Sequence, residues 1–249
     1  MTPFFFFWEH FMRLLSLAAA LALALPSLAQ AHGIWIAQRT GELAIVYGHG
    51  GSDDAYDPAK VRAVAARTAA GASAPVKIAR RERNVVIAPA EEAAVVTVVF
   101  DGGFWAKTRE GKWVNKGRRD VPDAESASHS LKYNTTVLAG IGGPLASQGL
   151  PLEIVPLADP MTLKPGDDLP VQVLKDGKPL AGVGVMADYV NESHGAPMTT
   201  DAEGKAVVVV RNDGLNVIAV SAFEPTPGDA DVDRKGLFAT LSFMLPHVE

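Results

Sequence analysis

The sequence predicts an all-β protein with two β-sandwich domains behind an N-terminal signal segment. Three observations lead to this fold class. Short runs of β-branched and apolar residues recur along the chain, and turn residues separate them at regular spacing. No convincing amphipathic helix pattern follows residue 31. The one long apolar run lies at the N-terminus, where a secretion signal belongs.

Residues 1–31 have the order of parts typical of a signal peptide. Arg13 precedes an apolar run over residues 14–25, Pro26 ends it, and Ala29 and Ala31 supply the small residues of a cleavage site. The run has about 12 residues, whereas a membrane-spanning helix needs about 20. Residues 1–11 fit a signal poorly, so Met12 is the expected true start. We therefore expect export to the periplasm, cleavage after Ala31, and no stable membrane insertion afterwards.

The N-terminal β-domain is expected over residues 32–147. Residues 34–36 and 43–47 read as two strands of a hairpin, with a turn at residues 39–42. Gly48 to Asp54 reads as a polar loop. Further strands are expected at residues 61–66, 76–79, 84–88, 94–100, 104–107, 112–115, 128–133 and 135–139. Asp101-Gly102-Gly103 is expected to end the strand that precedes it.

A stretch rich in Gly and Pro over residues 141–149 predicts a domain boundary. The C-terminal domain is expected over residues 150–249, with about seven strands at the regular spacing of a β-sandwich. Asp176-Gly177 is the strongest hairpin signal in it. Its phrase from residue 173 to 185 (VLKDGKPLAGVGV), followed by TTDAEGKA, resembles immunoglobulin-like and transthyretin-like modules of secreted proteins. The fold class is therefore all-β, with two immunoglobulin/transthyretin-like β-sandwich domains after a cleaved signal peptide.

Composition excludes several classes of function. The formal net charge is −5 and there is no basic run, so nucleic acid is not an expected partner. The absence of cysteine excludes thiolate metal sites, thiol nucleophiles and disulfides. No Gly-x-Ser-x-Gly elbow, phosphate-binding glycine loop or His-Glu-x-x-His motif occurs, so we expect no enzyme activity.

Several phrases together resemble the DUF4198 family of bacterial extracytoplasmic proteins. They are HGIWIAQR at residues 32–39, DDAYDP at 53–58, PLEIVPLADP at 151–160, ADYVNESH at 187–194 and LFATLSF at 237–243. The resemblance covers nearly the whole chain after residue 31. It implies a periplasmic component associated with nickel or cobalt uptake, with an envelope transporter or receptor as partner.

The histidines suggest metal binding, because neutral imidazole is a ligand for Ni, Co, Cu and Zn. Cleavage after Ala31 would make His32 the first residue, whose α-amine and Nδ1 could chelate one ion. A second imidazole would complete a T-shaped site of the kind that favours copper. The metal-ligating candidates are His32, His49, His129 and His194. For each of them the alternative is an ordinary solvated or terminal histidine.

The sequence thus predicts a non-catalytic periplasmic protein that captures or delivers a divalent transition-metal ion, either nickel or cobalt or copper. The alternative is a metal-independent β-sandwich module that binds a carbohydrate or protein partner at the cell envelope. In that case aromatic residues of the hairpin around residues 104–113 could stack on sugars, although such residues more often pack a core. A copper-dependent oxidase resembling the polysaccharide mono-oxygenases is a third, weaker hypothesis.

Overall fold

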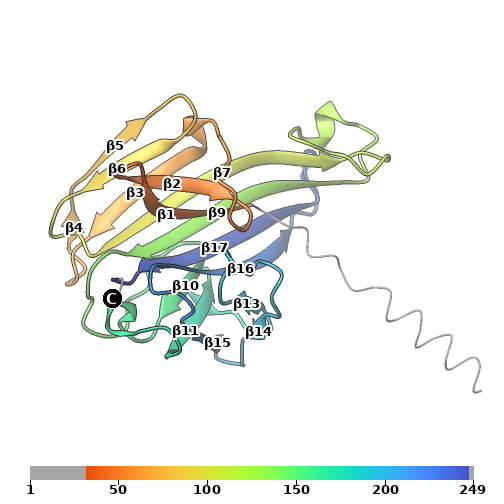
Figure 1. The fold of residues 1–249 in the computed structure, drawn as a ribbon. Coiled ribbons are helices and arrows are strands. Elements are labelled where there is room, and N and C mark those ends of the chain that lie inside the picture. The colour runs from red at the N-terminus through yellow and green to blue at the C-terminus, as the bar shows by residue number, and fades with distance from the viewer. Residues whose placement is uncertain (1–31, 247–249) are drawn as a thin grey trace, which may run out of the picture. The chain divides into compact units, whose positions relative to one another are not determined.

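The computed structural model describes residues 32–246 (Figure 1). The predicted signal peptide, residues 1–31, lies outside the described residues. Strands dominate, which confirms the all-β prediction, and they form three sheets in a sandwich-like arrangement. The helical segments between residues 32 and 246 are short 3-10 turns, η1 (Pro58–Lys60), η2 (Arg118–Asp120) and η3 (Pro160–Thr162). No helix in this range is long and apolar enough to cross a membrane.

The first sheet has four strands in the order β1-β2-β6-β5. Its strands are β1 (Gly33–Arg39), β2 (Glu42–Gly48), β5 (Val76–Arg80) and β6 (Val85–Pro89). Strands β1 and β2 form the predicted hairpin. Thr40 and Gly41 connect them with φ values of 49° and 83°, as a two-residue turn with positive φ at both positions requires. The register pairs Gly33 with Gly48, so the residues just beyond this pair, His32 and His49, lie at the same end of the hairpin.

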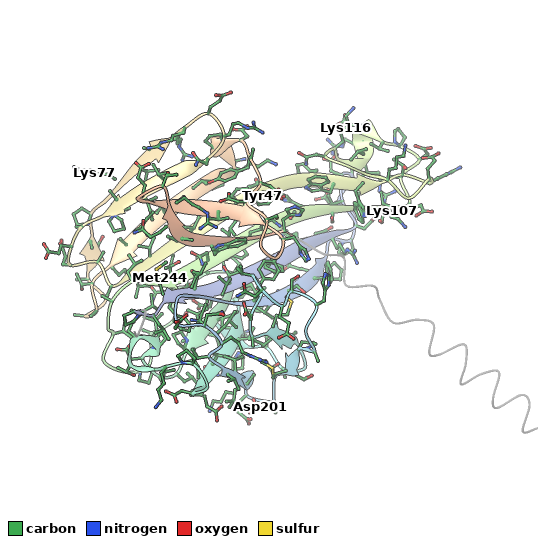
Figure 2. The ribbon with its side chains drawn as sticks, in the orientation of Figure 1. Tyr47, Lys77, Lys107, Lys116, Asp201 and Met244 are labelled. Atoms are coloured by element: carbon green, nitrogen blue, oxygen red, sulfur yellow. The ribbon has the colours of Figure 1, made fainter. Side chains whose placement is uncertain are left out.

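The central sheet has nine strands, ordered β14-β13-β16-β17-β9-β7-β3-β4 with β8 paired to β7. Its strands are β3 (Val61–Arg67), β4 (Ser73–Ala74), β7 (Val95–Lys107), β8 (Trp113–Val114), β9 (Ser126–Val137), β13 (Gly184–Met186), β14 (Met198–Thr199), β16 (Leu215–Pro225) and β17 (Arg234–Met244). Lys107 and Met244 mark opposite ends of this sheet in Figure 2. The long strands β7 and β9 extend beyond the β1–β2 hairpin (Figure 1).

The predicted end of a strand at residues 101–103 is wrong, because β7 runs through them. Asp101-Gly102-Gly103 does not end the strand, because a register shift between Asp101 and Gly103 absorbs the extra residue as a bulge. The strand then continues to Lys107, so two predicted strands are one.

The third sheet lies in the C-terminal half, where β10 and β15 both pair with β11 and β12 adds a short pair to it. Its strands are β10 (Leu152–Pro156), β11 (Asp168–Lys175), β12 (Lys178–Pro179) and β15 (Lys205–Val209). The predicted Asp176-Gly177 hairpin is confirmed, since both residues have positive φ and join β11 to β12.

Two apolar cores lie on opposite faces of the central sheet. One contains Ile34, Ile36 and Ile45 with Val98 and Phe100. The other, which includes Leu152, Leu169 and Leu241, fills the C-terminal half. Alternation of side chains along a strand lets β9 serve both cores: Tyr133 and Val137 point into the second, while Lys132, Asn134 and Thr136 face the first sheet.

The expected boundary between residues 147 and 150 separates neither the cores nor the sheets, because Tyr133 and Val137 precede it and belong to the second core. Strand β17, from the C-terminal half, lies parallel to β9 from the N-terminal half over residues 234–243 and 128–137. Residues from His32 onward form one compact unit. The two halves, predicted as β-domains over residues 32–147 and 150–249, are therefore joined by a continuous hydrogen-bonded sheet.

Candidate functional site

Three of the four predicted ligands lie together at the open end of the β1–β2 hairpin. The ring centroid of His49 lies 6.4 Å from that of His32 and 5.5 Å from that of His194. His32 precedes β1, His49 follows β2, and His194 belongs to the loop between β13 and β14. We call His32, His49 and His194 the histidine cluster. It joins residues from both halves of the chain.

Local backbone features bring the two loops into contact. Gly50 has a φ of 57°, and a Cβ built on it would lie 3.3 Å from Ser193 Oγ and 3.6 Å from the Val190 carbonyl oxygen. Glycine therefore suits this position both in conformation and in space. Asp188 holds the opposing loop by accepting hydrogen bonds from the backbone and side-chain amides of Asn191.

His32 is held by its neighbours in a defined tautomer. Its Nε2 lies 2.9 Å from Asp54 Oδ2, and because a carboxylate only accepts, Nε2 donates this bond. The neutral ring then carries its lone pair on Nδ1, the nitrogen that can chelate together with the α-amine. Tyr47 stacks on the ring at a centroid distance of 4.9 Å, and Figure 2 shows Tyr47 near the middle of the molecule, above the long strands. A carboxylate behind a histidine is the usual outer partner of a metal-bound imidazole.

His49 is held in the complementary tautomer. The Tyr189 hydroxyl accepts from the Gly33 amide at 2.9 Å and donates to the Gly48 carbonyl at 3.1 Å, so His49 Nδ1, at 3.3 Å, donates to it. The lone pair of His49 is then on Nε2. That nitrogen is buried and has no hydrogen-bond partner among the described residues. A buried polar atom without a hydrogen-bond partner is uncommon in folded proteins.

Electrostatics favour the neutral form of His49. Burial lowers its pKa below the usual range of histidine, and the charges of His194 and His32 lower it further. A metal ion requires the neutral imidazole, so the depressed pKa keeps His49 in its ligand form at neutral pH.

The spacing of the rings is compatible with one shared ion. Two imidazoles on one metal have centroids about 4.5–6.5 Å apart, since each nitrogen lies about 2.0–2.1 Å from the ion. Across residues 32–246, however, no group of three or more His, Asp or Glu side chains is placed so that it could hold a metal ion. Side chains alone therefore do not make a complete site in this arrangement.

His129 lies apart from the cluster. Its Nε2 is 2.7 Å from Asp101 Oδ1, and its ring stacks on Phe104 at 4.5 Å. Burial of the carboxylate acts to raise the pKa of Asp101, but His129, the Gly103 amide and Arg62 together lower it below its ordinary value. The four predicted ligands therefore do not form one group: three come together and His129 pairs with a carboxylate elsewhere.

Sequence reasoning did not anticipate the contact of Asp54 with His32 or the role of Tyr189. Asp53 and Asp54 stand out in the sequence as an acidic pair in the loop after β2, but a solvated acidic loop is the commoner interpretation. Tyr189 lies five residues before His194 in the phrase ADYVNESH, but nothing in the sequence shows that its hydroxyl reaches Gly33.

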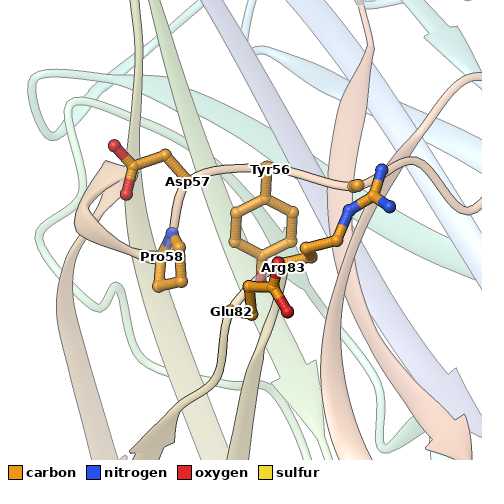
Figure 3. Close-up of a pocket in the computed structure, with 6 residues that line it drawn as sticks. Tyr56, Asp57, Pro58, Glu82 and Arg83 are labelled. Carbon is orange, nitrogen blue, oxygen red and sulfur yellow. The ribbon is translucent and has the colours of Figure 1, made fainter.

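A hollow of about 360 Å³ lies elsewhere, lined by Ala55, Tyr56, Asp57, Pro58, Glu82 and Arg83 (Figure 3). The Tyr56 hydroxyl donates to the Ile45 carbonyl at 2.7 Å and accepts from the Val85 amide at 3.0 Å. Burial raises the pKa of Tyr56 to about 12. Because its hydroxyl is engaged within the fold and no histidine lines the hollow, this surface does not extend the histidine cluster.

Comparison with known proteins identifies the family. The model of the family described as "Domain of unknown function (DUF4198)" matches residues 29–224, and the chain belongs to this family. An uncharacterised protein of Haemophilus influenzae is 28% identical over 219 residues, which cover 87% of this chain and 92% of that protein. No solved structure matches the chain.

Proposed function

We propose that this member of the DUF4198 family is a periplasmic protein that binds a divalent transition-metal ion at the histidine cluster and captures or delivers it without catalysis. The single observation that carries the proposal is the buried His49 Nε2, which has no partner within residues 32–246 although the rings of His32 and His194 lie close by. Nickel and cobalt follow from the sequence resemblance, and copper from the expected terminal histidine.

The proposal depends on the α-amine of His32. Cleavage after Ala31 would free this amine beside Nδ1, the ring nitrogen that the Asp54 contact leaves with a lone pair. The amine, His32 Nδ1 and His49 Nε2 would then supply three nitrogen donors, and His194 could add a fourth. The amine is the donor that a set built from side chains lacks. Nitrogen donors of this kind suit Cu(II) and Ni(II).

The test compares three forms of the purified protein. One begins at His32, one retains a methionine before His32, and one carries His49→Ala. Each is titrated with Cu(II), Ni(II), Co(II) and Zn(II) by calorimetry, and metal content after expression is measured by mass spectrometry. We expect the blocked terminus and His49→Ala each to weaken binding at least tenfold. His129→Ala is the matched control and keeps the affinity. Equal affinity in all forms would refute a site at the terminus.

The alternative function is a metal-independent module that binds a carbohydrate or protein partner. The observation in its favour is the extension of the central sheet, where Phe104, Trp113 and Phe223 are large apolar side chains exposed to solvent. It predicts no metal binding tighter than the micromolar range and envelope functions that are unaffected in His49→Ala. A pull-down with Phe223→Ala as the control would then identify the partner.

A further inference from the structure

Ser130 and Lys132 form a polar pair that the histidine cluster does not use. Both side chains lie on the same face of β9, because residues two apart on a strand point the same way. Lys132 Nζ is 3.0 Å from Ser130 Oγ. Only 2% of Lys132 is exposed, and no carboxylate pairs with its amine among the described residues. A buried amine without a counter-ion is costly, and such groups are often functional.

The backbone of β7 comes close to Ser130 at the bulge. Its cross-strand neighbours are both glycines, Gly103 on β7 and Gly236 on β17. The bulge of β7 lies at this point, and a Cβ on Gly102 would come within 3.0 Å of Ser130 Oγ. Bulges and strand glycines mark places where a ligand can approach the sheet closely. Ser130 is half-buried, whereas Lys132 is buried.

The surroundings of Lys132 favour a neutral amine. The rings of Tyr47 and Phe238 lie 5.9 Å from Nζ. Burial lowers the pKa of Lys132 to about 7, and the nearby charge of Lys60 acts in the same direction. A large share of the amine is therefore unprotonated near neutral pH and can accept a proton from the serine.

We propose that Ser130 and Lys132 are a nucleophile and general base that transfer the acyl group of small carboxylic esters to water. Pairs of serine and lysine perform this chemistry on unrelated folds. The proposal goes beyond metal binding and uses none of the residues of the histidine cluster. The sequence gives no hint of it, because the pair lacks the strand-to-helix turn of a serine elbow.

The steps balance without any further reactant. Ser130 Oγ forms a bond to the ester carbonyl carbon as its proton passes to Lys132 Nζ. The ester C–O bond breaks, and the alkoxide leaves with the proton from Nζ. Water then attacks the acyl-serine, giving its proton to Nζ, and the Ser130 oxygen takes the proton back as the carboxylic acid departs. Lys60, whose Nζ donates to the Gly102 carbonyl at 3.4 Å, is the cation beside the bulge that would stabilise the oxyanion.

The experiment uses a fluorophosphonate probe, which forms a stable adduct with activated serines. The purified protein is incubated with the probe at pH 8, and the adduct is located by peptide mass spectrometry. We expect one adduct, on Ser130, and a labelling rate at least 100-fold lower in Ser130→Ala and Lys132→Met. Ser128→Ala, two residues away on the same face, is the matched control and keeps the rate. The rate of 4-nitrophenyl acetate hydrolysis should likewise fall in Ser130→Ala and Lys132→Met and stay unchanged in Ser128→Ala.

Two outcomes would overturn the proposal: no adduct on Ser130 at millimolar probe, or equal labelling of Lys132→Met and the unaltered protein. Near-UV circular dichroism checks that each variant is folded. If Lys132→Met does not fold, Ser130→Cys and Ser128→Cys replace it. We then expect iodoacetamide to alkylate the Ser130→Cys variant at least tenfold faster than the Ser128→Cys variant at pH 7, and equal rates would refute an activating lysine. His49→Ala should not change labelling, so this test is independent of metal binding.

Discussion

The hydroxyl oxygen of Tyr189 lies 2.9 Å from the backbone nitrogen of Gly33, although 156 residues separate them in the chain. The same hydroxyl lies 3.3 Å from Nδ1 of His49. One phenol group therefore fixes the start of β1 and the ring of a proposed ligand at once. Burial raises the pKa of Tyr189 far above its usual value, so the phenol stays protonated and can donate to the Gly48 carbonyl.

Tyr189→Phe should destabilise the fold and weaken metal binding together. The Gly33 amide would lose its acceptor inside the protein, which costs about 1–3 kcal/mol. His49 would also lose the partner that orients its ring. Urea unfolding measures the first effect and metal titration the second. Tyr133→Phe is the control, because burial and nearby charges, with no hydrogen bond among the causes, raise the pKa of that buried tyrosine.

Asp54→Asn should weaken metal affinity by about 10–100-fold, the usual cost of removing an outer carboxylate from a ligating histidine. The amide cannot fix His32 in the tautomer that exposes Nδ1. Asp53→Asn is the matched control, since Asp53 pairs with Arg39 and not with the cluster. Calorimetric titration measures the metal affinity of both variants. An equal loss of affinity in the two would contradict the assigned role of Asp54.

Lys132→Met should stabilise the protein, and by more below pH 7 than above pH 9. The folded pKa of Lys132, about 7, lies below the ordinary value of 10.5, so the unfolded chain binds more protons between these limits. The stability of the unaltered protein should then rise with pH across this window, by up to about 1.4 kcal/mol per pH unit from this group. Below pH 7 the full penalty of the buried charge remains. Urea unfolding of both proteins from pH 6 to 10 gives the unfolding free energy of each as a function of pH. If the two curves are parallel, Lys132 does not cause the pH dependence.

Gly33→Ala should destabilise the hairpin end that carries His32. A Cβ at this position would lie 2.9 Å from ring carbons of both Tyr189 and Phe238, and overpacking of this kind costs about 1–3 kcal/mol. Gly214→Ala is the control, because its Cβ would meet nothing within 4 Å. The thermal unfolding temperature should fall in Gly33→Ala and change little in Gly214→Ala.

Local patterns were sufficient to predict the strands and the tight turns. The hairpin at Thr40 and Gly41 and the one at Asp176 and Gly177 both follow from turn chemistry. The bulge at Gly102 was missed because glycine ends a strand in some contexts and bends it in others. The parallel pairing of β9 with β17 left no local signal, since neither strand contains information about the partner.

Only the part of the site that belongs to the β1–β2 hairpin could be predicted from the sequence. The predicted β1–β2 hairpin lies between His32 and His49, and in the structure its register brings the two ring centroids to 6.4 Å. The approach of His194 depends on how two loops from different halves pack, and so does the reach of Tyr189. His129 faces Asp101 because of the register of β7 with β9, which the missed bulge controls. These are long-range consequences of packing.

Strand β17 follows every other described strand along the chain, yet it lies inside the central sheet, between β16 and β9. A chain that emerges gradually from a ribosome or a membrane channel cannot complete this sheet until residue 244 is free. Until then, one edge of its partner strand β9 has no hydrogen-bonded neighbour. Pairing of strands so far apart in the sequence closes a long loop, and such long-range pairing slows folding. Loss of β17 would therefore leave two open strand edges, on β9 and β16, that are prone to pairing with other chains.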